Sequence, residues 1–190
     1  MNKLDEIWKN TVTCENTIVL DTDVISSFTW VERFDIIIDL YTPNIIILDV
    51  VKDELIKVRH FFNRVNKYIE SGDIQFIEMD PYSDEGLEYA RLMKDLWSIG
   101  KGEAACMAYC RYHNCILGSN NFADILNYCK EFGIQIKTTV GIMLEAYEND
   151  LIDFRIGARM WKKMIEKRRK LPYRTFQEAI DNYREKREEN

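Results

Sequence analysis

The stretch Ile45-Ile46-Ile47-Leu48-Asp49 decides the fold class. Its four consecutive aliphatic residues predict a strand that is apolar on both faces, which is typical of a parallel sheet covered by helices on both sides. Short apolar runs of the same kind recur at residues 17–20, 74–77, 115–118 and 134–137. Segments with helical periodicity lie between them. We therefore expect an α/β fold, a three-layer α/β/α sandwich around a mostly parallel sheet of four or five strands.

The helical segments set the expected domain organisation. Helices are predicted at residues 24–41, 49–70, 83–97, 101–113 and 122–132. From Val140 onward the pattern is helical until Leu171-Pro172, and a last helix follows. We expect an N-terminal segment (residues 1–16), one main domain (17–152) and a basic helical C-terminal extension (153–190) packed on or beside it.

Length and composition exclude several classes of protein. The 190 residues are 46% hydrophobic and 31% charged, which suits a single globular domain. No apolar run approaches the roughly 20 residues of a membrane helix, and residues 1–10 do not resemble a signal peptide, so we expect a cytoplasmic protein. Five cysteines without a C-x-x-C pair are read as buried thiols in a reducing compartment.

Charge is distributed unevenly along the chain. The net charge is −6, yet residues 154–175 hold nine basic residues and one acid, which leaves −14 on the remainder. Such asymmetry indicates a polyanionic partner, an acidic surface covered by the basic segment, or simply a solvated helix face. If the partner is a nucleic acid, the candidate phosphate-binding residues are Lys162, Lys163, Lys167, Arg168 and Arg169.

Acidic and amide side chains follow successive strands. In an open parallel sheet, ligands bind at the carboxyl ends of the strands. Residues at these positions are Asp21, Asp23, Asp49, Asp53, Glu54, Glu103, Asn120, Asn121 and Asp124. Any one of these acids alone is readily explained as a helix cap. Several carboxylates brought together repel one another, however, and a hard cation such as Mg²⁺ or Mn²⁺ would offset that repulsion.

Four of these segments carry a family resemblance. Asp21-Thr22-Asp23 after a strand, Lys52-Asp53-Glu54, Gly100-Lys101-Gly102-Glu103 and Gly118-Ser119-Asn120-Asn121 together resemble a PIN-domain nuclease, the fold of the VapC-type toxins. The segment 132–146 and the ending around Leu171-Pro172 are similar to one uncharacterised prokaryotic subfamily, which has a Gly-Thr-Leu-Gly-like turn that leads into a helix and two final helices.

The resemblance implies a cluster of carboxylates that binds one or two Mg²⁺ or Mn²⁺ ions and cleaves RNA. Carried over by position, Asp21, Glu54 and Glu103 match the first three acids. The fourth acid of the family is replaced by Asn121, so the site has three carboxylates where four are usual. An amide oxygen still coordinates a hard cation but brings no full charge. Asp124 could compensate in part, or Asp23 or Asp53 from the other side, and Ser119 would orient the loop beside the metal.

Two functional hypotheses follow. The first is a metal-dependent endoribonuclease in which Asp21, Glu54, Glu103 and Asn121 are catalytic, and Asp21, Glu54, Glu103 and Asp124 hold the metal; family likeness adds an antitoxin protein and a homodimer as partners. The second is a PIN-fold module that binds RNA or protein without cleavage. A third and weaker hypothesis is a phosphatase-like or nucleotide-binding α/β protein, because Asp21-x-Asp23 after a strand also suits a phosphoaspartyl enzyme.

Overall fold

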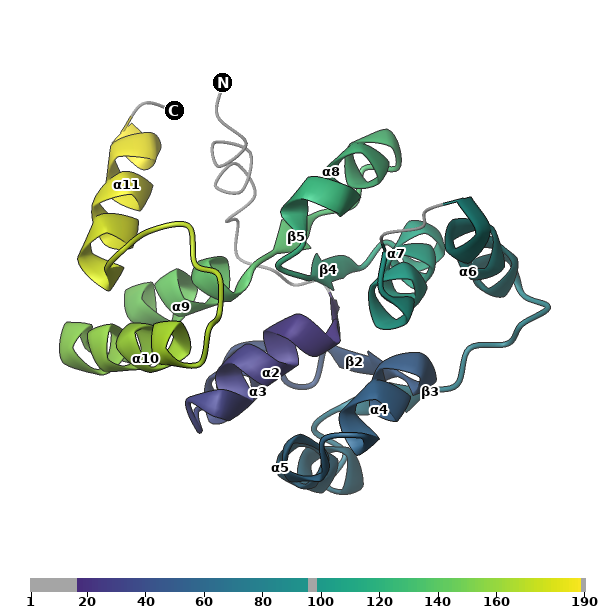
Figure 1. Ribbon diagram of the computed structural model, residues 1–190, viewed down its shortest axis with the longest axis horizontal. Helices are drawn as coiled ribbons and strands as arrows, with labels where there is room; N and C mark the ends of the chain where they lie inside the picture. Colours follow the sequence, from purple (N-terminus) through teal and green to yellow (C-terminus); the bar gives the residue numbers. More distant parts are fainter. Residues whose placement is uncertain (1–16, 96–98, 189–190) are drawn as a thin grey trace.

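The structure is a computed structural model that describes residues 17–95 and 99–188, apart from the side chains of residues 123 and 124. Five parallel strands form one sheet in the order β3-β2-β1-β4-β5 (Figure 1). They are β1 (Ile18–Leu20), β2 (Ile45–Leu48), β3 (Gln75–Ile77), β4 (Ile116–Gly118) and β5 (Ile136–Lys137). The central strand is β1, in which Val19 pairs with Ile46 of β2 and Leu117 of β4. The predicted N-terminal segment, residues 1–16, lies outside the described residues.

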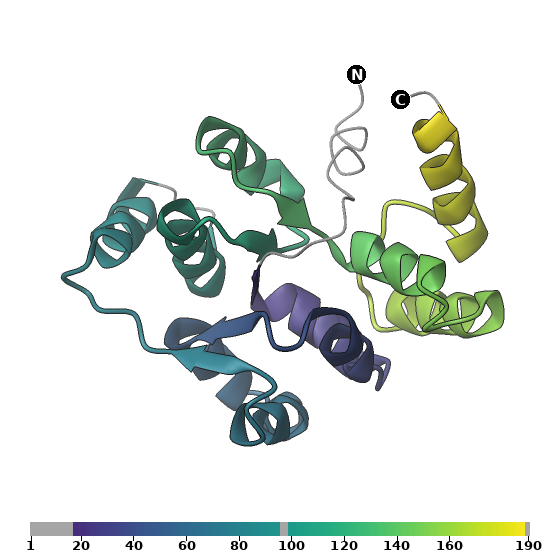
Figure 2. The same ribbon diagram turned by 180° about the vertical axis from the view of Figure 1, so that it is seen from behind.

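Helices cover both faces of the sheet, which confirms the predicted three-layer sandwich. Their bounds are α2 (Thr22–Trp30), α3 (Asp35–Tyr41), α4 (Asp49–Ile56), α5 (Arg59–Glu70), α6 (Asp84–Asp95), α7 (Lys101–His113), α8 (Phe122–Glu131), α9 (Thr139–Glu148), α10 (Phe154–Glu166) and α11 (Phe176–Glu188). Helices α6, α7 and α8 lie on one side of the sheet, and α2, α3 and α9 lie on the other (Figures 1 and 2). The central strands β1 and β2 are fully buried between these layers, as their apolar sequence requires.

Three of the predicted helices are interrupted. The segment 24–41 divides into α2 and α3 at Glu32, which has a positive φ of 63°, and the segment 49–70 divides at Val58. The segment from Val140 onward divides at Asp150, which has a φ of 58°. Asp153 then caps α10, and its Oδ1 accepts a hydrogen bond from the Ile156 amide at 2.6 Å. None of these breaks contains glycine or proline, and the hydrophobic periodicity continues across them. The sequence therefore gives no sign that the helices end there.

The C-terminal extension packs onto the rest of the fold through its apolar residues. Helix α10 contacts α2 and α9, and α11 contacts α9 and α10. Trp161 of α10 is 2% exposed and packs against Phe176 of α11. Gly157 allows this close approach, because a Cβ at that position would lie 2.1 Å from Cε1 of Phe176. Trp161 is therefore a core residue.

A buried acid links the helices on one side of the sheet. Glu88 of α6 is 5% exposed and forms ion pairs with Arg91 at 2.7 Å and Arg111 of α7 at 2.8 Å. The hydroxyl of Tyr128 in α8 donates a further hydrogen bond to Glu88 at 2.8 Å. These donors, Arg91 first, lower the pKa of Glu88 from 4.5 to about 2. One carboxylate thus joins α6, α7 and α8.

Two expectations from composition can be compared with the described residues. Cys106, Cys110, Cys115 and Cys129 are free and buried, as predicted for structural thiols, whereas Cys14 lies outside the description. Within the described ranges, no helix combines the length and the apolar character needed to cross a membrane.

Candidate functional site

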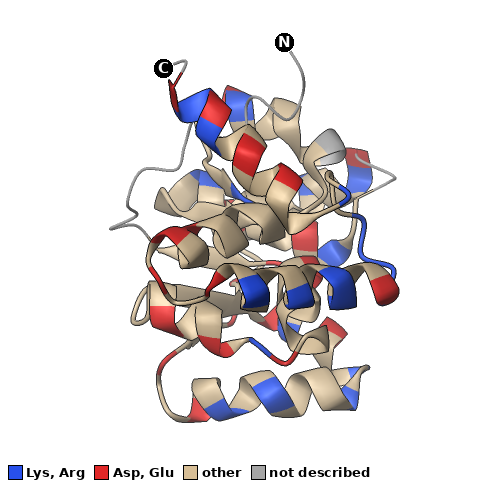
Figure 3. Cartoon of the chain, turned by 90° about the vertical axis from the view of Figure 1, so that its left-hand side faces the viewer, with Lys and Arg blue, Asp and Glu red and all other residues tan. Residues whose placement is uncertain are grey.

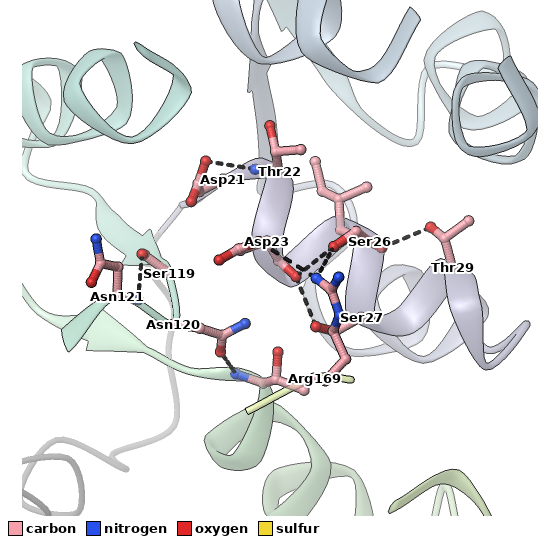
Figure 4. Close-up of polar contacts among 12 residues, drawn as sticks. Asp21, Thr22, Asp23, Ser26, Ser27, Thr29, Ser119, Asn120, Asn121 and Arg169 are labelled. Atoms are coloured by element: carbon pink, nitrogen blue, oxygen red, sulfur yellow. Dashed lines mark hydrogen bonds and ion pairs between the residues drawn. The ribbon is translucent and has the colours of Figure 1, made fainter. Parts of the chain in front are cut away.

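Asp21 lies at the carboxyl end of the central strand. It directly follows β1 and caps α2, with its Oδ1 accepting a hydrogen bond from the Thr22 amide at 2.6 Å (Figure 4). Its backbone amide donates to the carbonyl of Gly118 in β4 at 2.9 Å, which ties the residue to the neighbouring strand. Asp21 is only 6% exposed. The fold therefore holds an acid at the middle of the sheet edge where ligands bind in open parallel sheets.

Glu54 of α4 approaches the same position from the next segment of the chain. Its Oε2 accepts a hydrogen bond from Oγ1 of Thr22 at 2.6 Å, and its Oε1 accepts one from the Gly102 amide at 3.0 Å. A Cβ built on Gly102 would lie 2.9 Å from Oε2 of Glu54 and 3.2 Å from Oδ1 of Asp21. The two carboxylates thus lie side by side against the start of α7, and only glycine leaves room for them.

Glu103 completes the acidic group from the first turn of α7. It is 4% exposed, and its Oε1 accepts a hydrogen bond from Oγ of Ser119 at 2.9 Å. Its Oε2 accepts one from Nδ2 of Asn121 at 2.9 Å, while Oγ of Ser119 also accepts from the Asn121 amide at 3.2 Å. Ser119 and Asn121 therefore orient Glu103 through the turn that follows β4.

The charges around Asp21 are negative. Burial raises the pKa of Asp21 well above its usual range, and the negative charges of Glu103, Asp23 and Glu54 raise it further. The Thr22 amide opposes this shift. Among the residues that the structure describes, no lysine or arginine forms an ion pair with Asp21 or Glu54. Asp21 and Glu54 thus concentrate negative charge that no lysine or arginine of the described residues neutralises through an ion pair.

This donor set fits a hard divalent cation. Such ions prefer carboxylate and amide oxygens, and a positive ion would relieve the repulsion that raises the pKa of Asp21. In the described part of the chain, no three Asp, Glu, His or Cys side chains already share the spacing of metal ligands. The hydrogen bonds explain this separation, because Glu54 is held by Thr22 and Gly102 while Glu103 is held by Ser119 and Asn121.

The remaining predicted site residues lie farther out or outside the description. The side chain of Asp23 is 58% exposed and contacts Nη1 of Arg169 at 3.5 Å, so it forms the rim of the site (Figure 4). Asp53 is exposed on α4. Asp124 belongs to α8, but its side chain is outside the described residues, so its predicted role as a ligand stays a prediction.

The predicted phosphate-binding residues have different surroundings. Figure 3 views the molecule from the side of α9, α10 and α11, where basic and acidic residues both occur. Lys163 lies 3.6 Å from Glu32, and Nζ of Lys167 lies 4.7 Å from the ring centroid of Trp30. Lys162 and Arg168 are exposed. Nη1 of Arg169 donates to Oγ of Ser26 at 3.0 Å and contacts Asp23, which brings the basic segment to the rim of the acidic site.

Sequence reasoning missed two residues that shape the site, Thr22 and Gly102. Thr22 donates to Glu54, and Gly102 supplies both an amide donor and the space between two carboxylates. In the sequence, these two residues are marked only by their position next to a predicted acid: Thr22 follows Asp21, and Gly102 precedes Glu103. Neither hydrogen bond follows from spacing along the chain, since Thr22 and Glu54 are 32 positions apart and Gly102 and Glu54 are 48 apart.

Comparison with models of protein families yields a match. Residues 17–185 match a family model described as a PIN domain. A search of curated proteins finds no match to this chain. The matched range includes all five strands, the acidic site and the C-terminal helices up to the last turns of α11.

Proposed function

Because the chain belongs to the PIN-domain family, a nuclease-type fold that is generally metal-dependent, we propose that it is an endoribonuclease that requires Mg²⁺ or Mn²⁺. The observation that carries the proposal is the state of Asp21. This acid is buried at the carboxyl edge of the sheet, and its pKa is raised by burial and by neighbouring acids. Burying an acid among other acids costs stability, and a bound cation would offset that cost because it favours the ionised carboxylates.

The three carboxylates share one task in this proposal. Asp21, Glu54 and Glu103 would hold the ion, and the side-chain oxygen of Asn121 or the carboxylate of Asp124 would complete its ligands. When bound, the ion would supply Lewis acidity and positive charge for hydrolysis of a phosphodiester. Ser119 keeps Glu103 oriented, and Asp23 adds negative charge at the rim.

Five cations in the second half of the basic segment are the proposed source of RNA affinity. Outside residues 154–175 the chain carries −14, which repels a polyanion. Lys162, Lys163, Lys167, Arg168 and Arg169 would offset this repulsion through contacts that do not depend on RNA sequence. Family likeness alone supports an antitoxin that blocks the site, and likewise a homodimer; both remain proposals.

Cleavage of a labelled RNA by the full-length protein tests the nuclease. We expect cleavage with Mn²⁺ or Mg²⁺ and none with a chelator. Asp21→Asn should lower the rate by about 10³-fold or more, because loss of a metal ligand removes several kcal/mol of transition-state stabilisation. The control Asp53→Asn makes the same charge change at an exposed position of α4 and should retain the wild-type rate.

A non-catalytic module is the second candidate function, and Asn121 is the observation that favours it. The amide replaces a carboxylate and donates a hydrogen bond to Glu103, so the site has less charge than a four-acid site. If wild-type protein binds RNA but does not cleave it with either ion, and Asp21→Asn binds equally well, the module replaces the nuclease as the conclusion.

A further inference from the structure

We propose that a pocket beside the acidic site binds a phosphate of the polynucleotide backbone, through Arg168 and Lys170. The pocket has a volume of about 350 Å³ and lies between three segments: α2 at Asp23 and Ser27, the turn at Asn120 and Asn121, and the chain after α10 at residues 168–171. This inference rests on the proposed function, since it names the place where the substrate would be held.

The pocket and the acidic site share residues. Asn121 lines the pocket and donates a hydrogen bond to Glu103, and Asp23 lines the pocket and raises the pKa of Asp21. A ligand in the pocket therefore lies next to the carboxylates. Because those carboxylates repel phosphate, a phosphodiester can occupy this region only if cations hold its neighbouring groups.

The chain conformation after α10 turns basic side chains toward the pocket. Arg168 has a φ of 58°, and the amides of Arg168 and Arg169 donate to the carbonyls of Ile165 and Met164 at 2.8 and 3.0 Å. This left-handed ending of a helix is usually occupied by glycine, because a side chain there is strained.

The three basic residues of this turn have different tasks. Arg169 is a positioning residue, because it contacts Asp23 and Ser26 and so fixes the turn against α2 (Figure 4). Arg168 and Lys170 are exposed at the pocket and form no ion pair with any residue that the structure describes. Their charges remain available to a ligand.

Binding of a fluorescent single-stranded oligoribonucleotide tests the pocket, with chelator present so that cleavage cannot interfere. We expect the double variant Arg168→Gly, Lys170→Ala to bind at least about tenfold more weakly than wild type. The slope of log K against log salt should become shallower by about 1.4, because each phosphate contact on a single strand contributes about 0.7. Glycine suits the backbone at residue 168, so the melting temperature should not fall.

The control is Arg155→Ala, Arg159→Ala, which removes the same charge from exposed positions in the first half of α10. It should change affinity less than about twofold. Equal weakening by both double variants would overturn the pocket, because it would indicate a general effect of charge. Unchanged binding by the Arg168, Lys170 variant would also overturn it.

A competition experiment with inorganic phosphate tests whether the pocket prefers a polynucleotide to a small phosphate. Inorganic phosphate at millimolar concentration should displace the oligonucleotide only weakly, because it makes one set of contacts where the strand makes several. Tight phosphate binding without oligonucleotide binding would overturn the assignment to a polynucleotide. Since binding is measured without metal, a protein that binds RNA in the pocket but never cleaves it would support this inference while refuting the nuclease.

Discussion

Asp21 and Glu88 are both buried acids, but their surroundings have opposite charge. Glu88 contacts Arg91, Arg111 and the hydroxyl of Tyr128, and its pKa is lowered to about 2. Asp21 lies among Glu103, Asp23 and Glu54, and its pKa is raised. A buried carboxylate whose charge is satisfied by the protein stabilises the fold. One whose charge is left unsatisfied is suited to a ligand.

The largest effect on the free energy of unfolding is expected at Glu88, whose charge the protein pairs with arginines. Glu88→Gln should lower the free energy of unfolding by about 3 kcal/mol, because it leaves Arg111 partly buried without its counter-ion. Chemical denaturation at pH 7 measures this. The control Glu32→Gln removes an exposed acid that also pairs with an arginine, Arg64, and should leave stability nearly unchanged.

The pH dependence of stability sharpens the assignment of Glu88. Its pKa is lower in the folded state than its ordinary value of 4.5, so its stabilisation is present above pH 4.5 and is lost as the pH falls toward about 2. Glu88→Gln should lack this acid-induced loss. A variant that loses stability in parallel with wild type between pH 4.5 and 2 would contradict the role given to Glu88.

At Asp21, whose charge no lysine or arginine of the described residues pairs with, the addition of a metal ion should raise the stability of the protein. Mn²⁺ at 100 times its dissociation constant should stabilise wild-type protein by about 2.7 kcal/mol, through binding to the folded state alone. Asp21→Asn should lose most of this gain, yet in chelator it should be more stable than wild type because it removes a repelling charge. Thermal unfolding with and without Mn²⁺ measures both, and a variant that Mn²⁺ stabilises as much as wild type would exclude Asp21 as a ligand.

The metal-free pH dependence at Asp21 is also reversed relative to Glu88. The folded-state pKa of Asp21 lies above its ordinary value of 3.8, so the folded state binds the proton more tightly. Its effect on stability is therefore unfavourable once the carboxyl ionises, and stability falls as the pH rises from 3.8 toward the raised pKa. Asp21→Asn in chelator should remove that decline.

The sequence was sufficient to predict strands β1, β2 and β4 because they are buried on both faces. The apolar runs at Ile18–Leu20 and Ile45–Leu48 have no other explanation in a chain of this composition, and parallel strands bring their carboxyl ends to one edge. The proximity of Asp21 and Glu54 follows from this topology. The breaks at Glu32 and Asp150 do not, because non-glycine residues adopt positive φ there without a signal in the hydrophobic pattern.

The hydrogen bonds within the site were beyond sequence reasoning for a different reason. A motif indicates which side chains reach one edge of the sheet but not which of them bond to one another. Thus Asn121 was expected as a substitute ligand, and the structure adds that its amide donates to Glu103. In the metal-free protein the Asn121 amide thus donates a hydrogen bond to Glu103, which an ionised aspartate could not do. Residue 121 is therefore the most informative position for a substitution that is meant to tighten metal binding.

Asn121→Asp is the smallest of the expected effects and divides into two opposite parts. Without metal, the new carboxylate would face Oε2 of Glu103, where Nδ2 now donates at 2.9 Å, so the free energy of unfolding should fall by about 1 kcal/mol. With metal, a fourth acid should tighten Mn²⁺ binding about tenfold, or 1.4 kcal/mol, measured by calorimetric titration.

The control is Asn120→Asp, which adds the same charge one residue away while keeping the oxygen that accepts from the Thr139 amide. Equal tightening by both variants would mean that residue 121 acts through its charge alone and does not touch the ion.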